Sequence, residues 1–287
     1  MDQDFKKIFN HGNVLQYHDQ NLQEVWSDEA YKKYEFASWD WWHLPFSTAR
    51  CSQGNVFKPL TKRVESKSIL EIGSAMGQAY AFLKQTGMVD LSDYTGIEVS
   101  RLGHSVSKER FPETNWVLAD FSRYELDRDF DYAFERHAVH HMPEPLAQYR
   151  KIIGRTRCSV QTIFRGRLEG ETISDLRKGR FLGSRGVYYL NLINLSDLIN
   201  LGLSFNMNHI DVLYCGVHET ISGDESADVF LDHDVQKKGG RIMRFAVRMA
   251  RCGTQHAPKM NAFTKWKRLQ LSPRLFQIRR FLDKLTQ

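Results

Sequence analysis

The chain has 287 residues, of which 41% are hydrophobic and 12% aromatic, a composition that suits a globular protein with a sizeable core. No apolar run approaches the length of about 20 residues that a membrane-spanning helix needs. The N-terminus lacks the basic-then-apolar order of a secretory signal, so we expect a cytoplasmic protein. The four cysteines are too widely separated for a Cys-x-x-Cys pair or a zinc site, and no metal is expected.

The net charge of +6 is unevenly distributed along the chain. Residues 237–287 contain fourteen Lys and Arg and a single acid, Asp283, which gives this segment a charge of +13 and leaves the rest at −7. The basic character therefore belongs to the C-terminal end alone.

Residues 1–66 are rich in aromatic side chains but contain no clear strand pattern. The spacing of Trp26, Tyr31 and Tyr34 suits helical packing, which predicts a cap of two or three short helices. The Trp-Asp-Trp-Trp cluster at 39–42 either lines a substrate pocket or packs in a core.

From Ser68 onward, apolar runs typical of strands alternate with segments typical of helices. The predicted strands are 68–72, 94–99, 115–119, 130–135, 158–164, 208–215 and 241–249, and the predicted helices are 77–87, 101–110, 143–153 and 196–202. This alternation predicts a doubly wound, Rossmann-like α/β fold with a seven-stranded, mostly parallel sheet. The last strand follows its predecessor without a clear crossover helix, so we expect it to be reversed. Ser196 is the expected N-cap of the last of these helices.

Residues 253–287 are predicted to form a basic amphipathic extension after the α/β domain of residues 67–252. Ser272 and Pro273 are a good helix start, and apolar residues recur on one face of the segment that follows. Three interpretations remain open. Residues 259–287 could contact an anionic membrane surface. They could instead bind nucleic acid, which is the less favoured partner, or pack on the domain.

The segment from Ser68 to Gly77 is the most informative part of the sequence. An apolar run containing Glu71 leads into a turn with glycines at 73 and 77, where a ligand could approach the backbone closely. A pyrophosphate-binding Gly-x-Gly-x-x-Gly would need glycines at 75 and 78, where this chain has Ala75 and Gln78, and no Walker loop is present. Glu71 would also repel a pyrophosphate, whereas it suits a ligand with an ammonium group.

This combination resembles the class I S-adenosylmethionine-dependent methyltransferases. Their first motif, an acid followed by alternating glycines, corresponds to Glu71–Gly77, with Ala75 in place of the middle glycine. Glu98, at the end of the next predicted strand, matches the acid that accepts the ribose hydroxyls. The third motif matches Asp120, which would meet the adenine amino group, and Phe121, which could flank the adenine ring. The fourth region matches residues 130–142.

The resemblance implies S-adenosylmethionine as cofactor. The residues that would bind it are Glu71, Gly73, Ser74, Ala75, Gly77, Glu98, Asp120, Phe121 and Glu135. Of these, Glu135 could meet the amino-acid part of the cofactor or an acidic substrate.

Three histidines, His137, His140 and His141, follow the predicted strand 130–135, close to where the methyl group should lie. One of them could serve as general base near neutral pH, and His140 and His141 are the candidate catalytic residues. Alternatively, the His-His pair starts a helix and packs locally.

The acceptor is less constrained than the methyl donor. The Asn-Pro-Pro-Tyr signature of amino-methylating nucleic-acid enzymes is absent, which leaves a small molecule or saccharide, for example a surface-glycan or lipid-linked precursor beside the inner face of a membrane. The basic segment 165–190 would form either a lid for an anionic substrate or a solvated loop. Two other functions remain open: an NAD- or nucleotide-sugar-dependent oxidoreductase, and a non-catalytic binding protein with a degenerate methyltransferase fold. The acceptor atom and the oligomeric state are left open.

Overall fold

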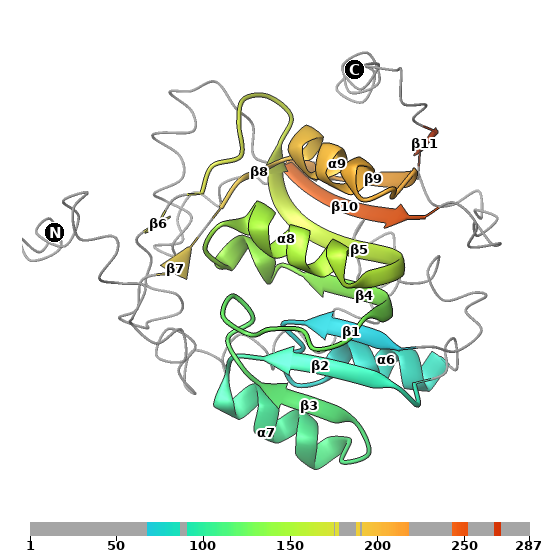
Figure 1. Ribbon diagram of the computed structural model, residues 1–287. Helices are drawn as coiled ribbons and strands as arrows, with labels where there is room; N and C mark the ends of the chain where they lie inside the picture. Colours follow the sequence, from blue (N-terminus) through green and yellow to red (C-terminus); the bar gives the residue numbers. More distant parts are fainter. Residues whose placement is uncertain are drawn as a thin grey trace, which may run out of the picture.

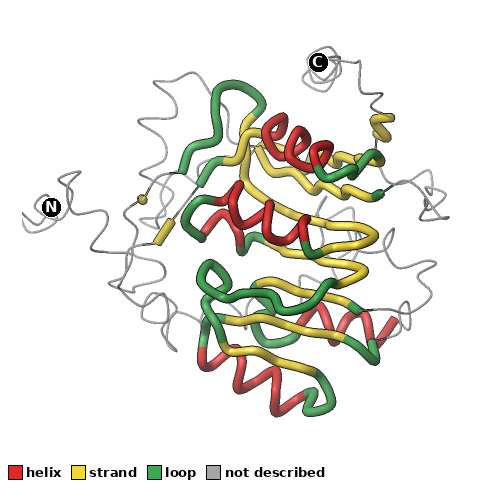
Figure 2. Tube along the Cα trace, viewed as in Figure 1, coloured by secondary structure: helices red, strands yellow, loops and turns green. Residues whose placement is uncertain are grey.

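The structure is a computed structural model that describes residues 68–86, 91–174, 176–177, 188–189, 191–217, 243–251 and 267–270. The helical cap predicted for residues 1–66 and the helix predicted after Ser272 lie outside these ranges. The described residues form an α/β body in which strands run through the middle with helices packed against them (Figures 1 and 2). No helix in these ranges is long and apolar enough to cross a membrane.

One large sheet contains all seven strands that the sequence predicts. They are β1 (Ile69–Ile72), β2 (Tyr94–Glu98), β3 (Asn115–Leu118), β4 (Phe130–Arg136), β5 (Thr156–Arg167), β9 (His209–Val217) and β10 (Met243–Ala250). Two more strands join this sheet, β8 (Ile193–Asn194) beside β5 and β11 (Lys267–Gln270) beside β9. A separate pair consists of β6 (Leu176–Arg177) and β7 (Tyr188–Tyr189).

The order of the strands in the sheet is β11-β9-β10-β5-β4-β1-β2-β3. Neighbours from β5 through β4, β1 and β2 to β3 are parallel. Strand β10 lies between β5 and β9 and is antiparallel to both, so the predicted reversal of the last of the seven strands is confirmed. The order turns back at β1, from which the chain proceeds to β2 on one side and later to β4 on the other. In open α/β sheets, ligands bind at this switch point, outside the carboxyl ends of the strands.

The four predicted helices are also present, as α6 (Gln78–Thr86), α7 (Arg101–Arg110), α8 (Pro145–Gly154) and α9 (Leu195–Ser204). The predicted cap of α9 was wrong. Asn194, not Ser196, precedes the helix, and its side-chain oxygen accepts hydrogen bonds from the amides of Ser196 and Asp197 at 2.7 and 3.2 Å.

Helices cover both faces of the sheet, and the strands are buried accordingly. Tyr149 and Ile152 of α8 and Leu198 of α9 pack with Leu70 and Val247 in the larger core, on the face that α8 and α9 share in Figure 1. A smaller core forms around α6, where buried apolar side chains include Ile69, Tyr80, Leu83, Tyr94 and Trp116. Strands buried on two faces have continuous apolar runs, which explains why β1 is recognisable in the sequence.

Part of the basic extension belongs to the sheet. Lys267 and Arg268 lie in β11, which pairs with β9 at the edge of the sheet. This strand was not predicted from the sequence, because it depends on long-range pairing with β9. The remaining residues of the 259–287 segment lie outside the described ranges, and its membrane contact stays a prediction.

Gly96, in the centre of β2, offers a test of this packing. A Cβ there would lie 2.4 Å from the buried Trp116 ring and 3.0 Å from the Ser74 Cβ. We predict that Gly96→Ala lowers the free energy of unfolding by about 1–3 kcal/mol, because a rigid ring and backbone must shift. A denaturant titration measures this change.

Gly154→Ala is the matched control, since its Cβ would make only an ordinary 3.5 Å contact with Phe205. We expect that variant to be neutral or more stable by up to about 1 kcal/mol. Equal losses in the two variants would contradict the packing described for β2.

Candidate functional site

The turn between β1 and α6 has an unusual backbone. Gly73, Ala75 and Gly77 all adopt positive φ angles, of 69°, 53° and 78°. Alternating glycines suit this conformation because they carry no Cβ. Ala75 adopts it as well, although a left-handed conformation costs an L-residue about 1–2 kcal/mol. The alanine in place of the middle glycine therefore adopts a left-handed conformation that a glycine would adopt without this cost.

The first amides of this turn are engaged by the neighbouring strand. The N–H groups of Gly73 and Ser74 both donate to the carbonyl oxygen of Ile97 on β2, at 2.9 and 3.1 Å. The amide of Gly77 donates to the Ser74 carbonyl at 2.9 Å.

Side chains engage the remaining two amides. The N–H of Ala75 donates to Oε2 of Glu98 at 2.7 Å, and that of Met76 donates to Oε1 of Gln78 at 3.0 Å. Every amide of residues 73–77 thus has a partner inside the protein. A phosphate site needs backbone N–H groups aimed at the anion, so this turn is not built as one.

Glu98 is the acid that the structure brings to the turn. It ends β2 and is 5% exposed, and its Oε1 accepts a second hydrogen bond from the Ser100 amide at 2.7 Å. Two backbone donors therefore fix the carboxylate beside Ala75. A carboxylate oxygen can accept more than one hydrogen bond, so this arrangement still suits a ligand with adjacent hydroxyls.

Glu71 and Ser74 point into the protein. Glu71 is fully buried and accepts a hydrogen bond from the hydroxyl of Tyr94. Burial raises the pKa of Tyr94 well above its usual value, and the charge of Glu71 acts in the same direction. The Ser74 hydroxyl is buried and has no hydrogen-bond partner among the described residues, and its Cβ lies close to Gly96. Both side chains are thus buried in the protein beneath the backbone of the turn.

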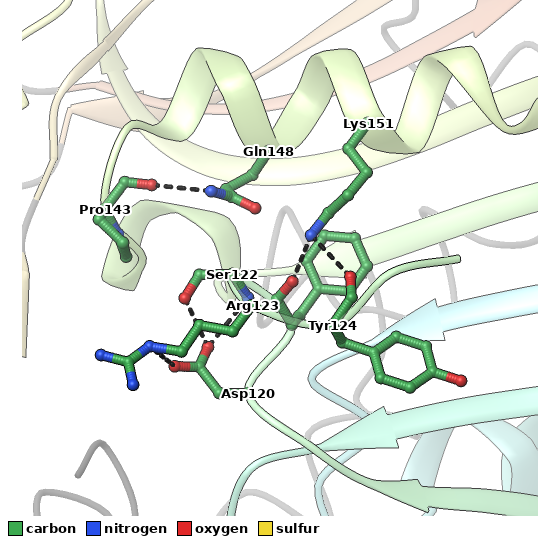
Figure 3. Close-up of polar contacts among 8 residues, drawn as sticks. Asp120, Ser122, Arg123, Tyr124, Pro143, Gln148 and Lys151 are labelled. Carbon is green, nitrogen blue, oxygen red and sulfur yellow. Dashed lines mark hydrogen bonds and ion pairs between the residues drawn. The ribbon is translucent and has the colours of Figure 1, made fainter. Parts of the chain in front are cut away.

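The loop after β3 holds Asp120, shown in Figure 3. One carboxylate oxygen accepts hydrogen bonds from the amide and hydroxyl of Ser122, at 2.9 and 2.7 Å, and the other lies 3.9 Å from Nε of Arg123. These contacts organise the loop, and the Asp120 side chain remains 22% exposed. It is both a turn residue and an accessible acid.

Lys151 of α8 fixes the same loop from above, as Figure 3 shows. Its ammonium group donates to the carbonyl oxygens of Phe121 and Tyr124 and lies 4.1 Å from the centre of the Phe121 ring. Burial lowers the pKa of Lys151. Because the Phe121 ring is only 2% exposed and belongs to the core, its position favours packing over the predicted contact with adenine.

Glu135 does not fit the predicted contact with a cofactor. It is 1% exposed, and its oxygens accept hydrogen bonds from Tyr149, Thr162 and the amides of Ala138 and Val139. The prediction is corrected because the whole carboxylate is engaged by the protein. Sequence inspection could not reveal this, since the donors come from three separate segments.

The three histidines lie together after β4. Val139–His141 form a short 3-10 helix, in which His140 is 1% exposed and its ring lies 4.0 Å from that of His141. The Nδ1 atom of His141 lies 2.8 Å from the Tyr189 carbonyl oxygen. A carbonyl only accepts, so Nδ1 carries the proton and Nε2 is the basic nitrogen of the neutral ring. His140 suits packing, whereas the half-buried His141 retains an oriented basic atom.

The glycine turn (residues 73–77) and the histidine loop (residues 137–141) are in contact. A Cβ on Gly73 would lie 2.6 Å from the Cβ of Ala138, the residue that follows His137. His137 adopts a positive φ of 56°, and its amide donates to the Ile163 carbonyl at 2.8 Å. The contact of Ala138 with Gly73 was missed by the sequence analysis, which contains no signal for it. Among the described residues, no group of acids, histidines and cysteines is arranged to hold a metal ion.

Comparison with known proteins shows which solved structures share this fold. No family model matches the chain, and no curated protein does. Among solved structures, a complex of DhpI with S-adenosylhomocysteine (SAH) matches with a TM-score of 0.50 and 12% identity, over 82% of this chain and 99% of that one. The YcgJ protein from Bacillus subtilis matches with 0.47 and 12%, over 69% and 97%. An S-adenosylmethionine-dependent methyltransferase from Mesorhizobium loti matches with 0.44 and 15%, over 69% and 96%.

The strand order, the reversed β10 and the first of these likenesses define the fold. The described part of the chain has the fold of the class I S-adenosylmethionine-dependent methyltransferases. The sequence motifs and the structure agree on this class.

The contact between Gly73 and Ala138 can be measured. We predict that Gly73→Ala lowers the free energy of unfolding by about 2–4 kcal/mol, because a left-handed alanine costs about 1–2 kcal/mol and the clash adds to it. Ala138→Gly removes the opposing Cβ, so the double variant should recover part of this loss. A double-mutant cycle by denaturant titration should give a coupling of about 1 kcal/mol or more. Additive effects would show that the two residues do not meet.

Proposed function

We propose that the chain is a methyltransferase that uses S-adenosylmethionine and acts on a small molecule or saccharide. The observation that carries this proposal is the Glu98 carboxylate, which is held against a turn whose amides are all engaged. Such a site offers acceptors to hydroxyl and ammonium groups, whereas the amides of its turn are not free to bind a phosphate. S-adenosylmethionine carries a ribose, an ammonium group and a single carboxylate but no phosphate, so its hydroxyl and ammonium groups fit these acceptors.

Each residue of the site would bind a different part of this cofactor. Glu98 would accept the ribose hydroxyls, and Asp120 would accept the adenine amino group from the neighbouring loop. The turn at residues 73–77 would support the cofactor through its shape. When bound, S-adenosylmethionine supplies a methyl group that its sulfonium makes electrophilic.

The chain's own task is then to orient the acceptor and remove its proton. A hydroxyl acceptor must lose a proton as the methyl carbon is attacked, and a histidine can accept it near neutral pH. His141 is the candidate base, because the Tyr189 carbonyl holds its Nδ1 and leaves Nε2 as the basic atom. His140 is nearly buried and would support it through the contact between their rings.

The same turn argues against the oxidoreductase alternative. NAD and nucleotide sugars carry a pyrophosphate, which Rossmann-type sites bind with free amides at the start of the first helix. Here the amides of residues 73–77 already donate inside the protein, which leaves only those at the start of α6 for a pyrophosphate, and the acid Glu98 lies beside the turn.

The acceptor is proposed only as a class. The segment at 165–190, where the sequence analysis allowed a basic lid, begins on β5 with Arg165 and Arg167. Arg167 is nearly buried, and its guanidinium donates to the Glu169 carbonyl. This contact leaves Arg167 with an internal role, so it lends no support to an anionic substrate. A glycan or lipid-linked precursor, and a location beside a membrane, rest on the basic composition of the extension.

A substitution of Glu98 tests the proposal. We predict that Glu98→Gln weakens SAH binding by about 1–3 kcal/mol, roughly 5- to 150-fold, because a charged acceptor is lost. Isothermal calorimetry measures the affinity, with circular dichroism to verify the fold.

Glu113→Gln is the control, since Glu113 is half-exposed and pairs with Lys84 on the surface at 2.6 Å. It should bind SAH as the wild type does. Unchanged affinity in Glu98→Gln would remove Glu98 from the site. A wild-type chain that does not bind SAH would end the proposal.

A further inference from the structure

Glu135 is a buried acid that the proposed reaction does not yet use. It lies near the carboxyl end of β4, in register with Ile72 on β1 and Thr162 on β5. Its side chain reaches Tyr149 of α8, on the face of the sheet that this helix covers. An acid in such an apolar setting requires hydrogen-bond donors on every side.

The structure supplies four donors. Oε1 accepts from the hydroxyls of Thr162 and Tyr149, the latter at 2.8 Å. Oε2 accepts from the amides of Ala138 and Val139, at 2.9 and 3.2 Å. Burial raises the pKa of Glu135, although all four donors act in the opposite direction. The hydroxyls of Tyr149 and Thr162 also lie 2.7 Å from each other, so the carboxylate, the tyrosine and the threonine form one hydrogen-bonded cluster.

These bonds determine where the histidine loop lies. Two of them hold the start of the 3-10 helix that carries His140 and His141. The other two join the carboxylate to α8 and β5, which are fixed in the core. Ala138, held by Oε2, is the residue that meets Gly73 of the turn. One carboxylate therefore sets the separation between the glycine turn and the histidines.

We propose that Glu135 is a positioning residue that holds the loop of residues 137–141 against the glycine turn, so that its histidines face the methyl donor. This inference rests on the proposed function for the direction of the effect. It assigns Glu135 no contact with cofactor or acceptor. The carboxylate acts through the backbone of Ala138 and Val139.

Glu135→Gln is the decisive variant. A glutamine has one neutral acceptor oxygen for the four donors, so the loop amides are held either by this weaker acceptor or by none. We expect the imidazole NMR signals of His137, His140 and His141 to shift and those of His104 to stay unchanged. His104 lies on α7, away from the loop, near the Trp116 carbonyl oxygen. The affinity for SAH should fall about tenfold, because the displaced loop contacts the glycine turn through Ala138 and Gly73.

Glu113→Gln serves as the matched glutamate control and should change neither readout. Tyr149→Phe removes one donor and leaves both loop amides bonded, so we expect smaller shifts of the same three imidazole signals. This second variant decides the question if Glu135→Gln does not fold.

Unshifted signals from residues 137–141 in a folded variant, with wild-type affinity for SAH, would overturn the inference. A wild-type chain that fails to bind SAH counts against the proposed function instead. The imidazole spectra still decide on Glu135 in that case, because they require no ligand.

Discussion

The hydrogen bond between the Ala75 amide and the Glu98 carboxylate is the contact on which the site depends. It joins the turn after β1 to the end of β2, so the Glu98 carboxylate is held directly against the left-handed backbone of the turn. Because the other amides of residues 73–77 are also engaged, the turn itself leaves no amide free for a ligand. The preference that we propose for a phosphate-free nucleoside rests on the hydrogen bonding of the turn, to which residue 75 contributes through its backbone N–H.

Three acids at the carboxyl edge of the sheet differ in what surrounds them. Glu98 is held by two backbone amides beside the turn, and Asp120 is partly exposed in its loop. Glu135 is enclosed by four donors and faces the core beneath α8. The first two can serve a ligand, whereas the third serves the protein. Residue type alone does not separate these roles, whereas the number and origin of the hydrogen-bond donors around each acid do.

Much of the fold was predictable from the sequence, because strands buried on two faces leave continuous apolar runs. The position of Glu98 was predictable too, since the carboxyl ends of adjacent parallel strands meet at one edge. Long-range contacts were not predictable. Glu135 needed Tyr149 and Thr162 from distant segments, and β11 needed its partner β9. The N-cap of α9 was assigned wrongly because Asn194 and Ser196 are both suitable capping residues. The hydrogen bond from the Asn194 amide to the Thr172 hydroxyl oxygen favours Asn194.

The central claim is that this turn accepts a sulfonium nucleoside and rejects a pyrophosphate. Parallel calorimetric titrations of the unmodified chain with SAH and with NAD test it most directly. The arrangement of Glu98 and the engaged amides predicts saturable one-to-one binding of SAH and no heat of binding with NAD. Binding of NAD without binding of SAH would contradict it.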